Sequence, residues 1–462
     1  MKKFNLLILV IFLFNLSNAQ QNAGKGLQFN DVAYSKIPMK APLVRSLYGS
    51  GLPSDASIKK WAPYPKSQGS YGTCTGWATT YAARTIIEAQ KNNWTDKTII
   101  TNNAFSPGFV YKLSQLEGDV NCSTGTYINR AIETIQNYGT PKYSDFSENC
   151  PDFISEEIMA KAVNFKVKDY AKIFGLNDGE NFKIEATKKS LSENKPVVIG
   201  MIVPPSFNNP TGCWTPTEQP DVSYGGHAMC VVGYDDNMYG GAFEIQNSWG
   251  DWWGNKGYIW VKYETYTTFT KYAYEIIDDF KVNPAGEIEL SGSIKFLLTN
   301  ASEMQAELEG NVYKMKNAYK SGTKFRFYIS NNEPAFVYAF GSDLTNKTYQ
   351  IFPHNPAISP ALNYTQNDLA LPDEDHWIEM DNNIGTDFFC VLYSNDLLDI
   401  DNIRSQIENE TGTFQEKVEK TLGTDLVNFD AVEYLSGEQI GFKTKSKGKS
   451  VVALIVEIEH VK

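Results

Sequence analysis

The sequence predicts an α+β fold followed by a separate β-rich domain, and three observations lead to this prediction. Residues Trp77–Ala89 place apolar side chains at helical spacing, whereas Ala228–Val232 is a short apolar run typical of a buried strand. Beyond Pro284 the chain alternates apolar and polar residues in short runs such as 324–330, which is typical of antiparallel sheet. The length of 462 residues suits two or three domains of about 100–200 residues each.

The first part of the chain is predicted to mix helices and strands. Ser106 is a suitable N-cap and Pro107 a suitable first residue for a second helix. Further helices are predicted at 127–138 and 183–192, and strands at 195–200, 228–232 and 242–246. In the C-terminal part, strands are predicted at 324–330, 335–340, 387–394 and 451–461, and one helix is predicted at 401–422.

The composition indicates a folded protein that does not bind nucleic acid. The chain is 42% hydrophobic and 21% charged, as globular proteins are. It has 42 basic and 54 acidic side chains, so its net charge is −12. Recognition of nucleic acid needs a clustered excess of Lys and Arg. We therefore expect no nucleic-acid partner.

The N-terminus has the pattern of a secretory signal peptide. Lys2 and Lys3 precede the apolar run Leu6–Phe14, and small residues follow at Ser17–Ala19. The run is shorter than the roughly 20 residues that a membrane-spanning helix needs. We expect residues 1–19 to be removed and the protein, with no transmembrane span, to be extracellular or periplasmic. The alternative is an uncleaved apolar anchor at the N-terminus.

Cys74 is the most informative of the six cysteines. Six are too few for a disulfide framework, even in an exported protein of this length, so each needs its own explanation. Cys74 ends the run QGSYGTC and opens the predicted helix at 77–89, where the positive end of the helix dipole favours the thiolate. We expect its pKa to lie well below the free-cysteine value of about 8.5. This environment is typical of a nucleophile, and a buried structural cysteine is the alternative.

One histidine and one asparagine complete a candidate catalytic set. Of the four histidines, only His227 lies in the first 350 residues, directly before the predicted strand at 228–232. Asn247 follows the predicted strand at 242–246. A Cys, a His and an Asn in one chain supply a nucleophile, a base and an amide that orients the base.

Three blocks of sequence resemble the papain-like cysteine peptidases. They are QGSYGTCTGWA at 68–78, GGHAMCVVGY at 225–234 and NSWGDWWGNKGY at 247–258. The separation of Cys74 and His227, 227 − 74 = 153 residues, is close to the family's separation of about 130–150. The resemblance implies a two-lobed fold over residues 52–282, with a helical left lobe and a β-barrel-like right lobe.

The resemblance also implies a role for each catalytic residue. Cys74 would be the nucleophile, and His227 would take its proton and later return one to the leaving amine. Asn247 would orient the imidazole, and Trp249 would shield the His–Asn hydrogen bond from water. Gln68 would join the backbone N–H of Cys74 in the oxyanion hole.

Three residues of the left lobe are assigned from the same resemblance. Gly125 would pair its backbone with an extended substrate, and a turn glycine is the alternative. Cys122 and Cys150 fall where the family carries disulfides, so either they pair with each other or Cys122 is free. Tyr71 stands where plant and animal members carry a second cysteine, which excludes the disulfide that those members form there.

The chain on either side of the peptidase is assigned more coarsely. Residues 20–51 are too few for the folded pro-segment of about a hundred residues that the family commonly carries, and they are predicted to be a strap or short pro-segment. Whether they cover the cleft is left open. Residues 283–462 are predicted to be a β-rich accessory domain that resembles an uncharacterised bacterial domain family, through segments 319–340, 352–355 and 369–377. This domain is expected to bind either another protein or a surface, and the sequence does not choose between them.

No cofactor or metal is predicted. His354 and His376 lack a neighbouring HExxH or paired CxxC motif. The predicted function is that of a secreted papain-like cysteine endopeptidase, which hydrolyses protein or peptide substrates through a Cys–His pair and a thioester. Two alternatives stay open: an inactive peptidase-fold binding protein, and a ligase or transpeptidase that uses the same thioester.

Overall fold

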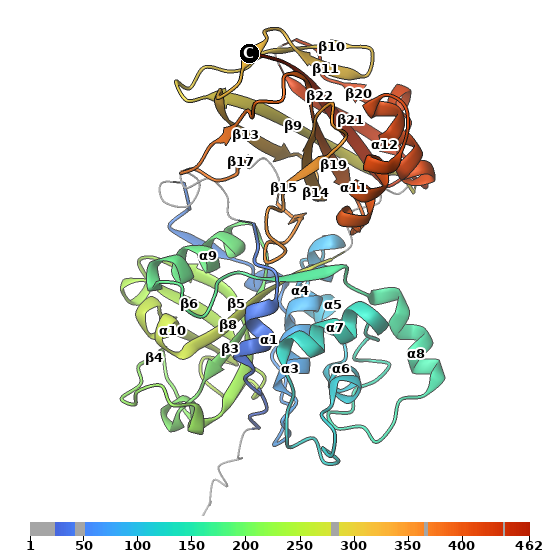
Figure 1. The fold of residues 1–462 in the computed structure, drawn as a ribbon. Coiled ribbons are helices and arrows are strands. Elements are labelled where there is room, and N and C mark those ends of the chain that lie inside the picture. Colours follow the sequence, from blue (N-terminus) through green and yellow to red (C-terminus); the bar gives the residue numbers. More distant parts are fainter. Residues whose placement is uncertain (1–23, 42–50, 279–285, 365–367, 438) are drawn as a thin grey trace, which may run out of the picture.

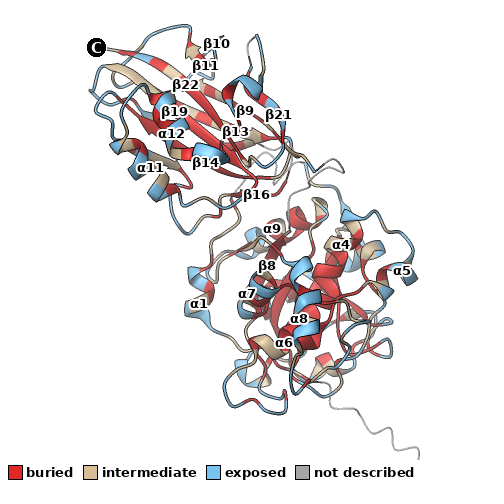
Figure 2. Ribbon diagram, turned by 90° about the vertical axis from the view of Figure 1, so that its right-hand side faces the viewer, coloured by how far each residue is buried: buried red, intermediate tan, exposed pale blue. Residues whose placement is uncertain are grey.

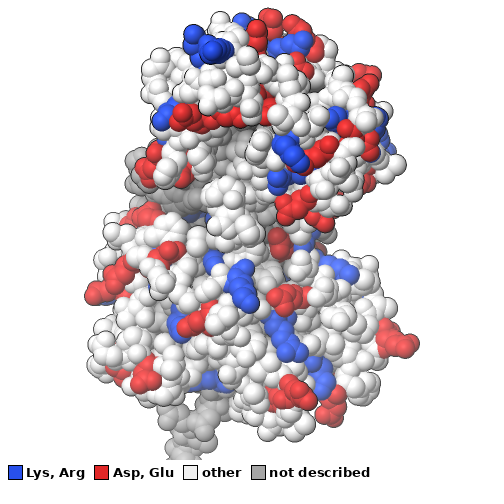
Figure 3. All heavy atoms as spheres, viewed as in Figure 1, with Lys and Arg blue, Asp and Glu red and all other residues white. Residues whose placement is uncertain are grey.

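The computed structural model describes residues 24–41, 51–278, 286–364, 368–437 and 439–462. The predicted signal peptide and the predicted domain boundary at 282/283 lie outside these residues. Figure 1 shows two bodies, one built from residues 51–278 and the other from residues 286–462. Basic and acidic side chains are interspersed on the face of both bodies that Figure 3 shows. No helix among the described residues is long and apolar enough to cross a membrane.

The first body has a helical lobe whose longest helix begins at Cys74. This helix continues through three labelled parts, α3 (Cys74–Gly76), the π-helical η2 (Trp77–Arg84) and α4 (Thr85–Lys91). The other helices of the lobe are α5 (Lys97–Asn102), α6 (Pro107–Ser114), α7 (Ile128–Tyr138) and α8 (Glu156–Ala162). Ser106 caps α6, because its hydroxyl accepts a hydrogen bond from the Phe109 N–H at 3.3 Å.

The second lobe is a mostly antiparallel sheet with the strand order β2-β8-β3-β5-β6-β7-β4, to which β1 adds at β5. Its strands are β1 (Asp55–Ser57), β2 (Asp169–Lys172), β3 (Val197–Ile202), β4 (Cys213–Trp214), β5 (Gly226–Asp235), β6 (Ala242–Gln246), β7 (Tyr258–Lys262) and β8 (Thr270–Ile277). Helices α9 (Glu180–Ser192) and α10 (Tyr263–Phe269) belong to this lobe. The described strands do not close into a barrel, because β2 and β4 form the two ends of the sheet. The predicted two-lobed α+β architecture is confirmed.

The C-terminal body contains two sheets, as the period-two pattern predicts. One has the order β10-β11-β22-β19-β14-β15 and the other β17-β13-β9-β21-β20, with short strands β12, β16 and β18 at their sides. The strands are β9 (Ile288–Leu298), β10 (Ala306–Glu309), β11 (Val312–Met315), β12 (Tyr319–Lys320), β13 (Lys324–Asn331), β14 (Ala335–Ser342), β15 (Thr348–Phe352), β16 (Ala361–Leu362), β17 (Asp368–Leu371), β18 (Ile378–Glu379), β19 (Gly385–Ser394), β20 (Glu433–Tyr434), β21 (Ile440–Ser446) and β22 (Val451–Val461). Figure 2 shows that buried residues line the strands of both bodies.

The single helix predicted at 401–422 is wrong, because the structure has two helices there. They are α11 (Ile400–Asn409) and α12 (Phe414–Leu422). Gly412 between them has φ +118°, which no helix residue adopts. Thr413 and Glu416 then form a reciprocal capping box that starts the second helix.

Residues 24–41, called the strap below, run along the first body and reach the second. The strap contains the short helix α1 (Asp31–Lys36), which lies in Figure 1 in front of the junction between the helical lobe and the sheet lobe. The hydroxyl of Tyr34 on α1 donates to the Phe174 carbonyl at 2.6 Å and accepts from the Ala273 N–H at 3.1 Å. The strap is therefore packed onto the sheet lobe.

Candidate active site

Cys74 is held at the junction of the two lobes. It is the first residue of α3 and is fully buried. Its sulfur accepts a hydrogen bond from the backbone N–H of Ala228 on β5, at 3.5 Å. Because Ala228 directly follows His227, this contact fixes the histidine strand of the sheet lobe against the sulfur of the helical lobe.

Hydrogen bonds fix the tautomer of His227. The Asn247 Oδ1 atom accepts from the backbone N–H of Ser248 at 2.7 Å, which identifies this atom as the amide oxygen. The same oxygen lies 2.7 Å from His227 Nε2, so Nε2 must carry the hydrogen. In the neutral ring Nδ1 is then the proton acceptor. His227 Nδ1 is buried and has no hydrogen-bond partner in the described structure, so it is free to accept a proton.

Trp249 covers the imidazole. Its ring centroid lies 4.6 Å from that of His227, with 31° between the ring planes. Trp249 is itself buried, and it packs against Trp253 and Phe207. A nonpolar cover of this kind keeps water from competing for the Nε2–Oδ1 hydrogen bond.

Gln68 is oriented by the serine that follows Asn247. Ser248 Oγ donates to Gln68 Oε1 at 2.6 Å, so the Gln68 amide nitrogen faces the opposite way. That nitrogen donates to the Gly24 carbonyl at 3.1 Å and to the Tyr71 carbonyl at 2.7 Å. The predicted oxyanion-hole donor, the amide nitrogen of Gln68, is therefore already hydrogen-bonded to carbonyl oxygens.

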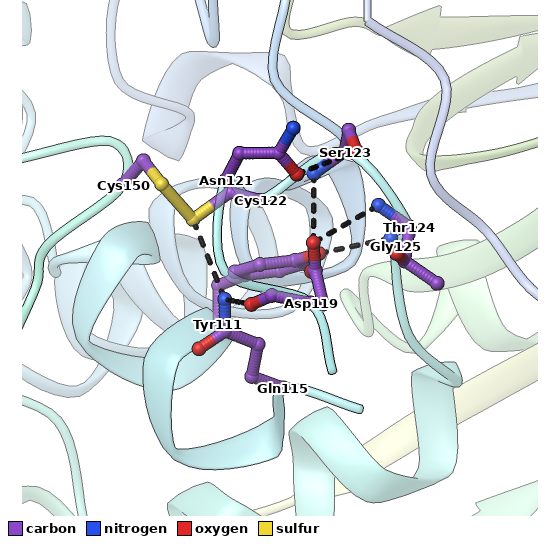
Figure 4. Close-up of a disulfide and its surroundings, with 9 residues drawn as sticks. All are labelled: Tyr111, Gln115, Asp119, Asn121, Cys122, Ser123, Thr124, Gly125 and Cys150. Carbon is purple, nitrogen blue, oxygen red and sulfur yellow. Dashed lines mark hydrogen bonds between the residues drawn. A yellow bond between two sulfur atoms is a disulfide. The ribbon is translucent and has the colours of Figure 1, made fainter. Parts of the chain in front are cut away.

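Hydrogen bonds to Tyr111 and Asp119 hold the loop that contains Gly125 (Figure 4). The Tyr111 hydroxyl donates to Asp119 Oδ2 at 2.5 Å and accepts from the Gly125 N–H at 2.9 Å. Asp119 Oδ1 accepts from the Ser123 and Thr124 N–H groups at 3.0 and 3.2 Å. Neither Tyr111 nor Asp119 was singled out from the sequence, because a buried tyrosine on a helix has no pattern that separates it from ordinary core.

Cys122 and Cys150 form a disulfide at the outer end of this loop (Figure 4). The Gln115 side chain contacts the Cys122 sulfur at 3.7 Å and donates to the Asp119 carbonyl. The disulfide thus ties the loop to the segment that precedes α8.

Two parts of the chain match known families. Residues 55–276 match the model for the papain family of cysteine proteases, and residues 318–396 match that of a domain of unknown function (DUF4384). Residues 55–276 are therefore similar to the papain family. An uncharacterized peptidase-like protein of Acanthamoeba polyphaga mimivirus is 29% identical over 212 residues. These residues are 43% of this chain and 63% of the viral protein, so the chain spans less than two thirds of that relative.

Solved structures of cysteine proteases are also similar to this chain. Xylellain of Xylella fastidiosa is 22% identical with a TM-score of 0.45, and the match covers 56% of this chain and 97% of xylellain. Bromelain of Ananas comosus is 17% identical with a TM-score of 0.38, and the match covers 49% of this chain and 99% of bromelain.

The strap fills the cleft of the papain-like segment. The Leu27 N–H donates to the Gly226 carbonyl at 3.1 Å, directly before His227. On the other side, the Thr126 N–H donates to the Gly26 carbonyl at 2.9 Å, and the Gln28 N–H donates to the Thr126 carbonyl at 3.0 Å. At Leu27 the strap therefore forms β-bridges to both lobes.

Thr126, rather than Gly125, makes the backbone contacts with the strap. The N–H of Gly125 is already bonded to Tyr111. Gly125 instead allows close approach, because a Cβ there would lie 1.8 Å from the Gly26 carbonyl oxygen, and its φ is +83°. The sequence singled out Gly125, whereas the residue that makes the hydrogen bonds with the strap is the next one, Thr126.

The Leu27 side chain occupies an apolar pocket between the lobes. It is 3% exposed. A Cβ on Gly200 of β3 would lie 2.8 Å from the Leu27 Cδ2 atom and 3.3 Å from atoms of Ile128 and Tyr272. The absence of a side chain at Gly200 thus leaves room for a leucine-sized group.

Burial behind the strap shifts the pKa values of both reacting groups. Burial raises the pKa of the Cys74 thiol to about 11, although N–H groups of Ala228 and Gly26 oppose the shift. Burial also lowers the pKa of the His227 imidazole to about 4, and the nearby positive charge of Lys25 on the strap acts in the same direction. The low pKa expected for Cys74 is therefore wrong for the closed site, which holds an uncharged thiol and an uncharged imidazole at neutral pH.

The remaining histidine candidates lie apart from this site. The His376 imidazole contacts the Asp373 carboxylate at 2.7 Å, on an exposed turn of the C-terminal body. In the part of the chain that the structure describes, no group of three or more His, Cys, Asp and Glu residues is placed to hold a metal ion.

Proposed function

We propose that the protein is an exported cysteine endopeptidase whose nucleophile is Cys74. The observation that carries this proposal is the fixed tautomer of His227, which presents an unpaired Nδ1 atom in the same buried site as the Cys74 sulfur. Asn247 and Trp249 hold the ring in this state. Export is inferred only from the sequence pattern of residues 1–19.

The chemistry follows from these positions. The Cys74 thiol gives its proton to His227 Nδ1, and the sulfur attacks the carbonyl carbon of the substrate. The developing oxyanion accepts hydrogen bonds from the Gln68 side chain and the Cys74 N–H. The protonated Nδ1 then gives its proton to the leaving amine as the C–N bond breaks, which leaves a thioester. Water adds to the thioester while its proton passes to His227, and the carboxylic acid and free thiol are released.

The strap supports two finer proposals about the substrate and the resting state. Its Leu27 side chain fills the pocket beside Gly200, so a substrate with a leucine-sized apolar side chain fits there. The N–H of Gly26 in the strap lies at the Cys74 sulfur, so the strap occupies the place that a substrate would need. The described state is therefore latent, and turnover requires that the strap leave the cleft.

Substitution of Cys74 tests the proposal. Cys74→Ala is expected to lower cleavage of a mixed peptide library by more than about 1000-fold. Cys213→Ala is the matched control, because Cys213 is a free, half-buried cysteine in the same body. Cleavage that persists in Cys74→Ala would exclude the assigned nucleophile. Products joined to an added amine would instead indicate a ligase, and wild-type protein without any turnover after removal of the strap would indicate a binding protein.

A further inference from the structure

The far end of the strap forms β-bridges to both bodies at Met39. On one side, the Lys172 N–H of β2 donates to the Pro38 carbonyl at 3.0 Å, and the Lys40 N–H donates to the Lys172 carbonyl at 2.8 Å. On the other side, the Met39 N–H donates to the Ala357 carbonyl at 2.6 Å, and the Ser359 N–H donates to the Met39 carbonyl at 2.8 Å. The strap therefore joins the edge of the peptidase sheet to the C-terminal domain.

A buried charge cluster lies at the same place. Lys40 Nζ contacts Glu193 at 2.7 Å and Glu275 at 3.0 Å. The Asn363 amide of the C-terminal domain donates to the other oxygen of Glu275, at 2.5 Å. Burial opposes the charge on Lys40, but the two carboxylates raise its pKa above the usual value, so it stays charged. Glu193 also contacts Lys189 at 3.2 Å, so the peptidase body supplies most of the cluster, and Asn363 is the member that belongs to the C-terminal domain.

The strap continues into that domain. Ala41 is fully buried in a core cluster made otherwise of C-terminal residues, including Leu290 and Phe327. Only ten residues separate the contacts of Gln28 in the cleft from those of Met39, and six of them form α1. Tyr272 donates to Asp31 at the start of this helix, at 2.6 Å. The connection between the two ends is therefore short and itself fixed to the peptidase.

We propose that the C-terminal domain is the anchor of the strap, so that the cleft opens only when residues 357–363 of that domain release residues 38–41. The proposal rests on the proposed function in taking the Cys74 cleft as the site that the strap closes. It gives the domain of unknown function a role, because a change in that domain then controls access to a site in the other body.

Amide hydrogen exchange in the full-length wild-type protein tests the coupling. The amides of Leu27 and Gln28 report the cleft end. At the anchored end, the Met39 amide reports release from Ala357 of the C-terminal domain, and the Lys40 amide reports release from Lys172 of β2. If one opening event frees both ends, the four amides exchange with protection factors that agree within a few fold. Cleft amides that exchange 100-fold faster than the anchored pair would overturn the proposal, because the strap would then leave the cleft while still anchored.

Substitution of Asn363 tests the role of the C-terminal domain. Asn363→Leu and the milder Asn363→Ala both remove the donor to Glu275, and either should accelerate exchange at Leu27 and Gln28 by about tenfold or more. Asn311→Leu is the matched control, because the Asn311 amide donates to a carboxylate, Asp430, within the C-terminal domain alone.

Two results separate this proposal from the proposed function. Faster exchange at Met39 without any change at Leu27 in the Asn363 variants would refute the anchor. Alkylation of Cys74 by an epoxide, which should accelerate in parallel with exchange, needs no peptidase turnover. A protein that shows the predicted exchange and alkylation but cleaves no peptide would refute the proposed function and leave the anchor standing.

Discussion

Gly26 is the strap residue whose substitution should open the cleft most directly. The strap crosses the active site so closely that Gly26 packs on the backbone of Gly72, two residues before the nucleophile. We expect Gly26→Ala to shift the protein from the closed to the open state without altering any residue of the proposed catalytic set.

The structure gives the size of the expected shift in the ratio of closed to open protein. A Cβ at position 26 would lie 1.8 Å from the Gly72 carbonyl oxygen, whereas real contacts are essentially never under 3.0 Å, so the backbones must separate by at least 3.0 − 1.8 = 1.2 Å. This movement breaks the three backbone hydrogen bonds that Gly26, Leu27 and Gln28 make with Thr126 and Gly226. At about 1 kcal/mol each, the loss is about 3 kcal/mol, or about 150-fold in the ratio of closed to open protein.

The rate at which an epoxide thiol probe labels Cys74 measures this ratio. Gly179→Ala is the matched control, because an added Cβ at Gly179 meets nothing within 4 Å and its φ is −64°. At neutral pH, Gly26→Ala should label about 100-fold faster than the wild type, and Gly179→Ala should label at the wild-type rate. Equal rates for Gly26→Ala and the wild type would show that the strap does not limit access to the nucleophile.

Three further predictions concern pH, the orienting amide and the disulfide. Burial lowers the pKa of His227 to about 4, and Lys25 of the strap acts in the same direction, so the closed state binds fewer protons than an open state in which the imidazole is exposed, and the closed state loses stability as the pH falls toward 4. The open fraction should therefore rise toward pH 4, and the protection factor of the Leu27 amide should fall; an unchanged protection factor between pH 7 and pH 4 would contradict this. Asn247→Ala removes the acceptor for Nε2–H, and kcat should fall by about tenfold or more while Cys74 can still be labelled; an unchanged kcat would exclude the orienting role. Replacing Cys122 and Cys150 by Ser frees a loop closed over 28 residues and should cost about 3–4 kcal/mol of unfolding free energy in denaturant titration, and an unchanged midpoint would contradict this.

The residues of the proposed catalytic set could be selected from the sequence because they lie in blocks whose local structure is encoded nearby. Cys74 follows a turn and opens a helix, His227 is the second residue of β5, and Asn247 directly follows β6, which pairs with β5 in the sheet. These three positions needed no knowledge of distant contacts.

The strap could not be predicted in the same way. Its position depends on contacts with residues about 100 to 330 positions away, such as Thr126, Gly226 and Ala357. The one local signal was the pair of glycines Gly24 and Gly26. A Cβ atom on either of them would lie 1.8 Å from a backbone carbonyl oxygen, so neither position tolerates a side chain. The break between α11 and α12 was likewise marked by Gly412, but the apolar spacing continues across it.

The formation of an acyl-enzyme at Cys74 tests the central claim most directly. The Gly26→Ala variant is mixed with a peptide ester, quenched in acid within seconds and examined by intact mass and peptide mapping. We predict a mass increase equal to the acyl group, located on Cys74 and absent from Cys74→Ala in the same background. Hydrolysis of the ester without an adduct, or an adduct on Cys213, would contradict the assignment of Cys74 as the nucleophile.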